Sequence, residues 1–279
     1  MVLLNEIQLK QFEQHLINEE CAASTIEKYL RDIRAFLSSP ACGTELSKDM
    51  ILEYKKSLSE KYKSTSTNSM LVALNRFLSF CGYHDLQVKL LKIQHRSYRE
   101  QDKELSIAEY KKLVLEAKKN KNERLCLLIQ TICSTGIRVS EHRYITAETL
   151  RTGSVRIANK GKERTIFLSK DLRQILARYC RENRIGTGPV FVTKNGTPLN
   201  RCNIWAEMKA LCKNTGIEPK KVFPHNLRHL FALTYYRLEK DIVRLADILG
   251  HTNIETTRIY TSTTEEECIR SLSRLNLLL

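Results

Sequence analysis

The sequence predicts a mainly α-helical protein with one small antiparallel β-sheet, divided into an N-terminal helical domain and a C-terminal mixed α/β domain. Apolar residues recur at helical spacing along most of the 279-residue chain. The stretch 144–168 instead holds two short β-rich segments around a turn. A charged segment without apolar periodicity covers residues 93–104 and has the composition of an exposed linker. We therefore expect domains at residues 1–92 and 105–279.

The N-terminal domain is expected to contain about four short helices. Residues 9–16 carry one apolar stripe. The segment Ser24 to Glu27 has the spacing of a capping box, and the helical pattern behind it continues until Pro40. A later stripe at residues 70–78 ends at Gly82, where a helix C-terminus favours glycine. Such a unit is too small for a deep catalytic pocket, so we expect the chemistry in the second domain.

The second domain is expected to begin with two helices and a hairpin. Ser106 to Glu109 repeats the capping box, and residues 123–135 form an apolar helix that Gly136 can terminate. Segments 155–157 and 165–167 alternate around a lysine-rich turn, which predicts a hairpin with lysines at its tip. Helical spacing then returns and continues, with a break at Gly186 to Pro189, to the end of the chain.

The excess positive charge belongs to the second domain. The chain has 46 lysines and arginines against 31 acidic residues, a formal charge of +15. Residues 1–95 carry 12 basic and 11 acidic side chains, so residues 96–279 hold +14 of it. An imbalance of this size predicts a polyanionic partner or an anionic surface.

Composition also argues against a membrane, exported or metal-binding protein. The sequence has no run of about 18 apolar residues and no basic segment leading into an apolar one at its N-terminus. Nine cysteines occur singly, without a CxxC pair, mostly within apolar helical patterns. We therefore expect a soluble cytoplasmic protein with no metal and no other cofactor.

Four short motifs in the second domain carry the chemistry. They are Gly136 to Glu141 (G-x-R-x-S-E), His225 to His229 (H-x-L-R-H), Leu249 to His251 (L-G-H) and Thr256 to Tyr260 (T-T-x-x-Y). Through them the sequence resembles the tyrosine recombinases, the group of phage and transposon integrases and Xer-type recombinases. The motifs occur in the family's order, with the basic hairpin between the first two, which makes a chance match very unlikely. The resemblance implies the two-domain tyrosine-recombinase architecture, with a helical core-binding domain before a catalytic domain.

Two arginines are the candidate clamp for a phosphate. Displacement at a phosphodiester builds negative charge on the equatorial oxygens, and fixed cations stabilise that charge. The planar arginine fork matches two phosphate oxygens and stays charged near neutral pH. Arg138 follows a helix-ending glycine, and Arg228 lies one turn after His225 on a helix opened by Pro224. Each alone is more often a surface charge or a simple phosphate contact; within the ordered motifs we expect both to be catalytic.

The histidines are candidate hydrogen-bond donors to phosphate. His225 and His251 can donate to phosphate oxygens, and His225 can also accept the proton of a tyrosine. For His229 we expect the ordinary role of bracing its helix. A zinc site on His225 and His229 is disfavoured because Arg228 would lie between the two ligands.

Tyr260 is the expected nucleophile. A protonated tyrosine is a weak nucleophile and needs nearby positive charge and a base, which the arginines and histidines supply. Tyr29, Tyr110 and Tyr179 lie on helical stripes and fit packing roles, whereas Tyr260 follows a polar segment with no evident apolar reason for its presence. The leaving oxygen needs a proton, and the resemblance places the hairpin lysine at Lys160, with Lys162 as a close rival. An ordinary phosphate contact is the alternative role for either lysine. The resemblance also implies that Glu141 orients Arg138, although a solvated helical glutamate is the simpler alternative.

The expected function is site-specific DNA recombination through a 3′-phosphotyrosine intermediate, without ATP or metal. The resemblance implies that the partner is double-stranded DNA at specific sites. It also implies a homotetramer on two such sites, in which the C-terminal tail of each protomer, residues 265–279, docks on the adjacent protomer. Without DNA the protein can be a monomer. Ile269, Leu272, Leu275 and Leu279 give that tail an apolar stripe. Two alternatives remain: relaxation of DNA in the manner of a type IB topoisomerase, and helical DNA binding without catalysis.

Overall fold

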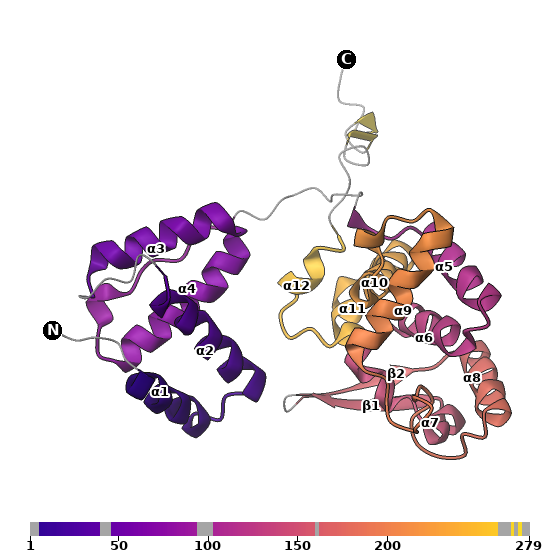
Figure 1. Cartoon of the computed structure of the whole chain (residues 1–279). Helices are drawn as coiled ribbons and strands as arrows, with labels where there is room; N and C mark the ends of the chain where they lie inside the picture. Colours follow the sequence, from indigo (N-terminus) through magenta and orange to yellow (C-terminus); the bar gives the residue numbers. More distant parts are fainter. Residues whose placement is uncertain are drawn as a thin grey trace. The chain divides into compact units, whose positions relative to one another are not determined.

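The computed structural model describes residues 6–39, 46–93, 103–159, 162–261, 269–270 and 273–274, for residues 159 and 162 the backbone only. The mainly helical fold with a small antiparallel sheet is confirmed (Figure 1). The chain divides into two compact units, Met1–His95 and Arg96–Leu279. Residues 94–102, most of the expected linker, lie outside the described residues. None of the described helices is both long and apolar enough to span a membrane.

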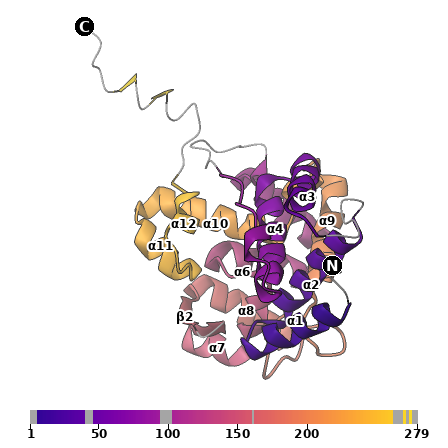
Figure 2. The same ribbon diagram turned by 90° about the vertical axis from the view of Figure 1, so that its left-hand side faces the viewer.

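The described part of the N-terminal unit contains four α-helices and one short 3-10 helix. They are α1 (Glu6–Asn18), α2 (Ala23–Leu37), α3 (Lys48–Lys61), α4 (Ser64–Phe80) and η1 (His84–Leu86). The α4 helix serves both apolar clusters of the unit: Phe77 packs with the buried residues of α1 and α2, while Leu71 and Leu74 pack with those of α3. In Figure 2, α4 lies among α1, α2 and α3.

Two details of this unit differ from the sequence expectation. Helix α2 begins at Ala23 with Ala22 as the N-cap and no side-chain cap, so the capping box expected at Ser24 is wrong. Ser24 and Glu27 instead lie inside the first turns of the helix. The sequence pattern also did not locate α3, whose start is marked by Ser47, the side chain of which accepts a hydrogen bond from the Met50 amide at 3.2 Å.

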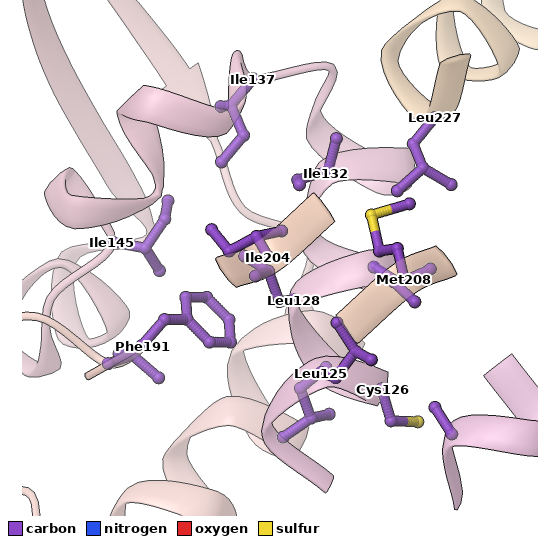
Figure 3. Packing of buried hydrophobic residues seen from close by; sticks show 14 of the residues in the cluster. Leu125, Cys126, Leu128, Ile132, Ile137, Ile145, Phe191, Ile204, Met208 and Leu227 are labelled. Atoms are coloured by element: carbon purple, nitrogen blue, oxygen red, sulfur yellow. The ribbon is translucent and has the colours of Figure 1, made fainter. Parts of the chain in front are cut away.

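The C-terminal unit has the following helices and strands. They are α5 (Ile107–Lys119), α6 (Glu123–Thr135), η3 (Val139–Tyr144), α7 (Ala147–Thr152), β1 (Ser154–Asn159), β2 (Lys162–Phe167), α8 (Lys170–Glu182), α9 (Arg201–Thr215), η4 (Pro219–Lys221), α10 (Pro224–Glu239), α11 (Ile242–Leu249) and α12 (Glu255–Arg258). Helix α6 is central and packs against α5, α9 and α10. Figure 3 shows Leu128 and Ile132 of α6 facing Ile204 and Met208 of α9, with Leu227 of α10 beside them.

Two helix ends predicted from sequence are confirmed, and the second positions the site. The Ser106 hydroxyl accepts from the Glu109 amide at 3.1 Å and the Glu109 carboxylate accepts from the Ser106 amide at 2.8 Å, a complete capping box. Gly136 ends α6 with φ of 66°. A Cβ there would lie 2.4 Å from the Phe231 ring. Two constraints therefore favour glycine at position 136: the backbone is left-handed, and α10 approaches too closely for a Cβ atom. The left-handed turn directs the chain into η3.

The predicted hairpin is also confirmed. β1 and β2 pair antiparallel with Ile157 opposite Arg164 and Val155 opposite Ile166. Because opposite residues share one face of a sheet, Arg164 lies on the same face as the buried Val155, Ile157 and Ile166. The hairpin extends from the helical body of its unit (Figure 1), and β2 contacts α11. An arginine thus occupies an inward position of the strand.

His142 is a buried imidazole in the C-terminal unit. It lies on η3 with 3% of its surface exposed, near the Phe191 ring. One ring nitrogen, Nδ1, contacts the Val139 carbonyl, and the other, Nε2, is buried without a partner. Burial lowers the pKa of His142, against the hydrogen bond to Val139, which raises it. The folded protein therefore disfavours the protonated form relative to the unfolded chain.

We expect the free energy of unfolding of the C-terminal unit to fall as pH drops below the ordinary histidine value, because the unfolded chain then binds a proton that folded His142 resists. The His142→Phe variant should show a shallower pH dependence than the wild type. Urea unfolding monitored by the single tryptophan, Trp205 in α9, reports on this unit. Equal slopes for the variant and the wild type below pH 6.5 would contradict the assignment.

Candidate active site

Residues of three of the four sequence motifs line two clefts of the C-terminal unit, and Tyr260 of the fourth motif lines neither. Arg138 starts η3, His225 and Arg228 lie in the first turns of α10, and His251 follows the glycine that ends α11. A cleft of about 950 Å³ is lined by Arg138 and His251 among others. A second of about 550 Å³ is lined by Arg138, His225 and Arg228. Arg138 is common to both, and its half-exposed side chain faces solvent more than the other arginine does.

Arg228 connects three of the motifs. Its side chain is only 1% exposed. The guanidinium donates from Nη1 to the Gly136 carbonyl at 2.7 Å, and from Nη2 to the Leu249 carbonyl at 2.6 Å. Nη2 also lies 3.1 Å from His251 Nε2. Burial, and then repulsion from Arg138 and Arg164, lowers the pKa of Arg228 to about 10, which leaves it charged at neutral pH.

The contacts of His251 define its tautomer. Because an arginine N–H can only donate, Nε2 of His251 accepts from Arg228. The proton is then on Nδ1, which donates to the hydroxyl of the fully buried Thr257 at 2.9 Å. Burial, followed by the charges of Arg228, Arg138 and Arg164, lowers the pKa of His251 to about 4. His251 is thus neutral at pH 7, and sequence reasoning had not singled out Thr257 as its partner.

The Glu141 carboxylate joins two arginines. Oε2 accepts from the Arg138 amide at 2.7 Å, and Oε1 accepts from Arg138 Nη1 at 3.1 Å. The expected contact between Glu141 and Arg138 is therefore present. Oε2 also accepts from Arg164 Nη2 at 2.6 Å. The sequence analysis missed Arg164; the signal was a charged residue two positions before Ile166, at an inward position of an alternating strand.

His225 lines the smaller cleft beside the arginines. Partial burial lowers its pKa first, and the positive charges of Arg228, Arg138 and Arg201 lower it further. The imidazole is therefore neutral near pH 7 and retains a nitrogen lone pair. A neutral imidazole can accept a proton from a hydroxyl group.

Tyr260 lies in an apolar environment that the sequence did not suggest. Its side chain is 3% exposed and packs with Ala232, Leu233, Leu245 and Leu249 of α10 and α11. The interpretation that nothing apolar accounts for this tyrosine was wrong, because two helices distant in sequence supply the cluster. Burial raises the pKa of Tyr260, whereas Arg228 and Arg138 act in the opposite direction. His229 was expected only to brace its helix; its ring lies edge-on to Tyr260 with centroids 4.9 Å apart.

The structure describes the side chain of neither candidate lysine of the hairpin. Lys160 lies outside the described residues, and only the backbone of Lys162 is described, paired with Asn159. Among the described residues, no group of three histidine, cysteine, aspartate or glutamate side chains could hold a metal ion.

The arrangement gathers more positive than negative charge. Arg138, Arg164 and Arg228 interact electrostatically with one another, and Glu141 is the carboxylate that binds two of them. The imidazoles of His225 and His251 have lowered pKa values and stay neutral. A site of this kind favours a bound anion and can stabilise charge that develops on phosphate oxygens.

Two family models match this chain, one in each of its two units. Residues 103–267 match the family model "Phage integrase family", and residues 9–81 match "Phage integrase, N-terminal SAM-like domain". The chain is 29% identical to tyrosine recombinase XerA of Pyrococcus furiosus over 278 residues, which covers 97% of this chain and 94% of that protein. It is 30% identical to tyrosine recombinase XerD of Rhizobium meliloti over 270 residues, covering 88% and 86% of the two chains.

Solved structures show the same fold. XerH site-specific recombinase bound to its difH substrate, a pre-cleavage complex, is 20% identical with a TM-score of 0.69, over 99% of this chain and 86% of that one. The Tn1549 transposon integrase in complex with circular intermediate DNA is 18% identical with a TM-score of 0.73, over 96% and 99%. Both halves of this chain thus have counterparts, in sequence and in fold, among the same group of proteins. The chain belongs to the phage integrase family of tyrosine recombinases.

Proposed function

We propose that this protein is a site-specific DNA recombinase that cleaves and rejoins DNA strands through a 3′-phosphotyrosine link formed by Tyr260. The observation that carries the proposal is the position of Tyr260 within the electrostatic reach of Arg138 and Arg228, the two arginines of the family motifs. Fixed positive charge of this kind lowers the cost of forming a phenolate and of building charge on a phosphate.

The reaction is a transesterification. Tyr260 Oη attacks the scissile phosphorus, the bond from phosphorus to the 5′ oxygen breaks, and the phosphate stays linked to the 3′ end. His225, neutral because its pKa is lowered, accepts the phenolic proton. Lys160 donates a proton to the departing 5′ oxygen, with Lys162 as the alternative donor. Arg138, Arg228 and His251 hold the phosphate oxygens, and the negative charge of the phosphate favours a protonated His251 once DNA is bound.

The phosphotyrosine link retains the energy of the broken bond. A 5′ hydroxyl from a partner strand attacks the same phosphorus, releases Tyr260 and takes over the phosphate. Because one phosphodiester is exchanged for another through an ester intermediate, the cycle as proposed consumes no ATP and uses no metal ion.

Double-stranded DNA is the proposed partner of both parts of the chain. Residues 1–92 form a core-binding domain on one face of the duplex, residues 93–104 a linker, and residues 105–279 a catalytic domain on the other face. The +14 charge of residues 96–279 supports this, as do the related recombinases whose solved structures contain DNA. The seven described cysteines are all free, which supports a reducing cytoplasm as the site of action.

The proposed assembly is a homotetramer on two DNA sites, linked by the tails at residues 265–279. A head-to-tail contact can close into a ring when its rotation permits. Four residues of this tail, 269–270 and 273–274, are described, and the side chain of Ile269 is exposed. The apolar stripe at Ile269, Leu272, Leu275 and Leu279 therefore supplies the surface that a neighbouring subunit would bury.

Tyr260→Phe should abolish the covalent protein–DNA adduct while DNA affinity stays near the wild-type value, since one hydroxyl is lost and the basic surface is kept. The measurement is a denaturing gel with a nicked suicide duplex that traps the adduct, next to a gel-shift titration. Tyr235→Phe is the matched control, because Tyr235 lines the larger cleft and packs against the same apolar cluster. Adduct from Tyr260→Phe, or none from wild type, contradicts the proposal; adduct without joining of two sites would indicate a topoisomerase.

Arg138→Ala should slow single-turnover cleavage on the order of 10²–10³-fold while changing DNA affinity much less, because it removes a donor to the developing charge. Arg228→Ala would in addition leave two buried carbonyls without a donor, so Arg228→Lys, which keeps the charge but loses the fork, is the better probe. Arg244→Ala, at an exposed arginine of the larger cleft, is the control. Variants that lose affinity but cleave normally at saturating DNA would make these arginines simple phosphate contacts.

Truncation after Thr264 should leave a protein that binds one DNA site but yields little recombinant product, because the inter-subunit contact is removed. The double variant Leu272→Ser, Leu275→Ser keeps the length and charge of the tail and should show the same loss. Binding is measured by gel shift, assembly by light scattering with two-site DNA, and product by a plasmid assay. Full recombination by the truncated protein would contradict the inter-subunit contact and would indicate that the apolar stripe packs on its own subunit.

A further inference from the structure

Arg164 is an arginine on the inward face of the small sheet. Its neighbours on that face, Ile157 and Ile166, are 1% and 3% exposed, and its own side chain is 11% exposed. Burial lowers its pKa, against the opposing effect of Glu141. Charged side chains at such positions cost stability unless they are paired. The ion pair of Arg164 Nη2 with Glu141 Oε2, at 2.6 Å, offsets part of this cost, whereas Nε of Arg164 is buried without a partner.

The first contact limits how Arg138 can be oriented. Glu141 Oε2 accepts both the Arg138 amide, at 2.7 Å, and Arg164 Nη2, at 2.6 Å, while Oε1 accepts Arg138 Nη1 at 3.1 Å. Arg164 and the Arg138 amide thus share one oxygen of the carboxylate, while the other oxygen faces the Arg138 guanidinium. The Glu141 side chain is 3% exposed, so water cannot readily replace either partner.

The second contact is with the loop that carries His251. A Cβ built on Gly250 would lie 2.6 Å from Arg164 Nη1 and 2.7 Å from its Cδ. The Arg164 side chain therefore packs directly on the backbone of Gly250, the residue before His251. Through one side chain, β2 contacts both the residue that orients Arg138 and the turn that presents His251.

We propose that Arg164 is a positioning residue for strand cleavage, which fixes Arg138 through Glu141 and supports the Gly250 turn beneath His251. The inference rests on the proposed function, since it concerns the rate of cleavage by Tyr260. It assigns Arg164 no contact with the DNA. Its effect passes through Arg138 and His251, which are the groups that meet the phosphate.

The first test compares Arg164→Gln with Arg156→Gln in single-turnover cleavage of the suicide duplex at saturating DNA. Arg156 is exposed on β1, so its variant removes the same charge from the same sheet without touching Glu141. Arg164→Gln should cleave about 10- to 100-fold more slowly, by analogy with the loss seen when a residue that orients a metal ligand is replaced. Arg156→Gln should cleave at the wild-type rate. Arg164→Lys, which keeps the charge but has one donor group, should fall between Arg164→Gln and the wild type.

A double-mutant cycle separates positioning from general stability. In an Arg138→Ala background the part of the effect that passes through Arg138 is already lost, so adding Arg164→Gln should slow cleavage much less than it does in the wild type. A change that merely loosens the fold would lower the rate by the same factor in both backgrounds. Equal factors would overturn the proposal.

Gly250→Ala moves Arg164 without changing any charge, and it serves if Arg164→Gln does not fold. Gly216→Ala is the matched control, because Gly216 also ends a helix with positive φ, 67° against 64° for Gly250, but a Cβ there meets nothing within 4 Å. Gly250→Ala should reproduce the slow cleavage, and Gly216→Ala should not. Wild-type rates in Arg164→Gln or Gly250→Ala would overturn the inference alone, whereas a wild type that forms no adduct would overturn the proposed function.

Discussion

The buried guanidinium of Arg228 is the interaction on which the site depends. It donates to the carbonyls of Gly136 and Leu249, which end two helices far apart in the sequence, and it fixes Nε2 of His251. An arginine that is 1% exposed can keep its charge only if its N–H groups are satisfied. Here two helix-terminal carbonyls and His251 Nε2 accept hydrogen bonds from Nη1 and Nη2, which stabilises the charge in its buried position.

The charge balance around Arg228 follows from this arrangement. Glu141 is occupied by Arg138 and Arg164, so its negative charge serves to orient those cations. Burial lowers the pKa values of His225 and His251 first, and the charges of Arg228 and Arg138 lower both further. Without DNA the cluster holds uncompensated positive charge close to Tyr260. In the proposed reaction the bound phosphate supplies the missing negative charge, so that binding of the substrate favours protonation of the histidines.

The aromatic ring of Tyr260 links this charged cluster to the apolar core. The ring packs between α10 and α11 and against His229, while its electrostatic neighbours are Arg228 and Arg138. Packing thus holds the ring, and the arginines oppose the rise in pKa that burial causes. From sequence, His229 was expected only to brace its own helix. Its ring contact with Tyr260 shows that it also packs against the expected nucleophile.

The sequence by itself determined the helical fold, the hairpin and the ends of α5 and α6, because capping residues, a left-handed glycine and apolar spacing act within a few residues of each other. It also determined the motif residues, since their types and order match the phage integrase family. Only the tertiary structure decided the buried setting of Tyr260, the pairing of His251 with Thr257 and the contacts of Arg164 with Glu141 and Gly250. Several of these contacts join elements far apart in the sequence, and the short one between His251 and Thr257 depends on how the turn after α11 folds back, so local spacing carries no record of them. Hydrogen-bond geometry and burial in the folded chain are what select them.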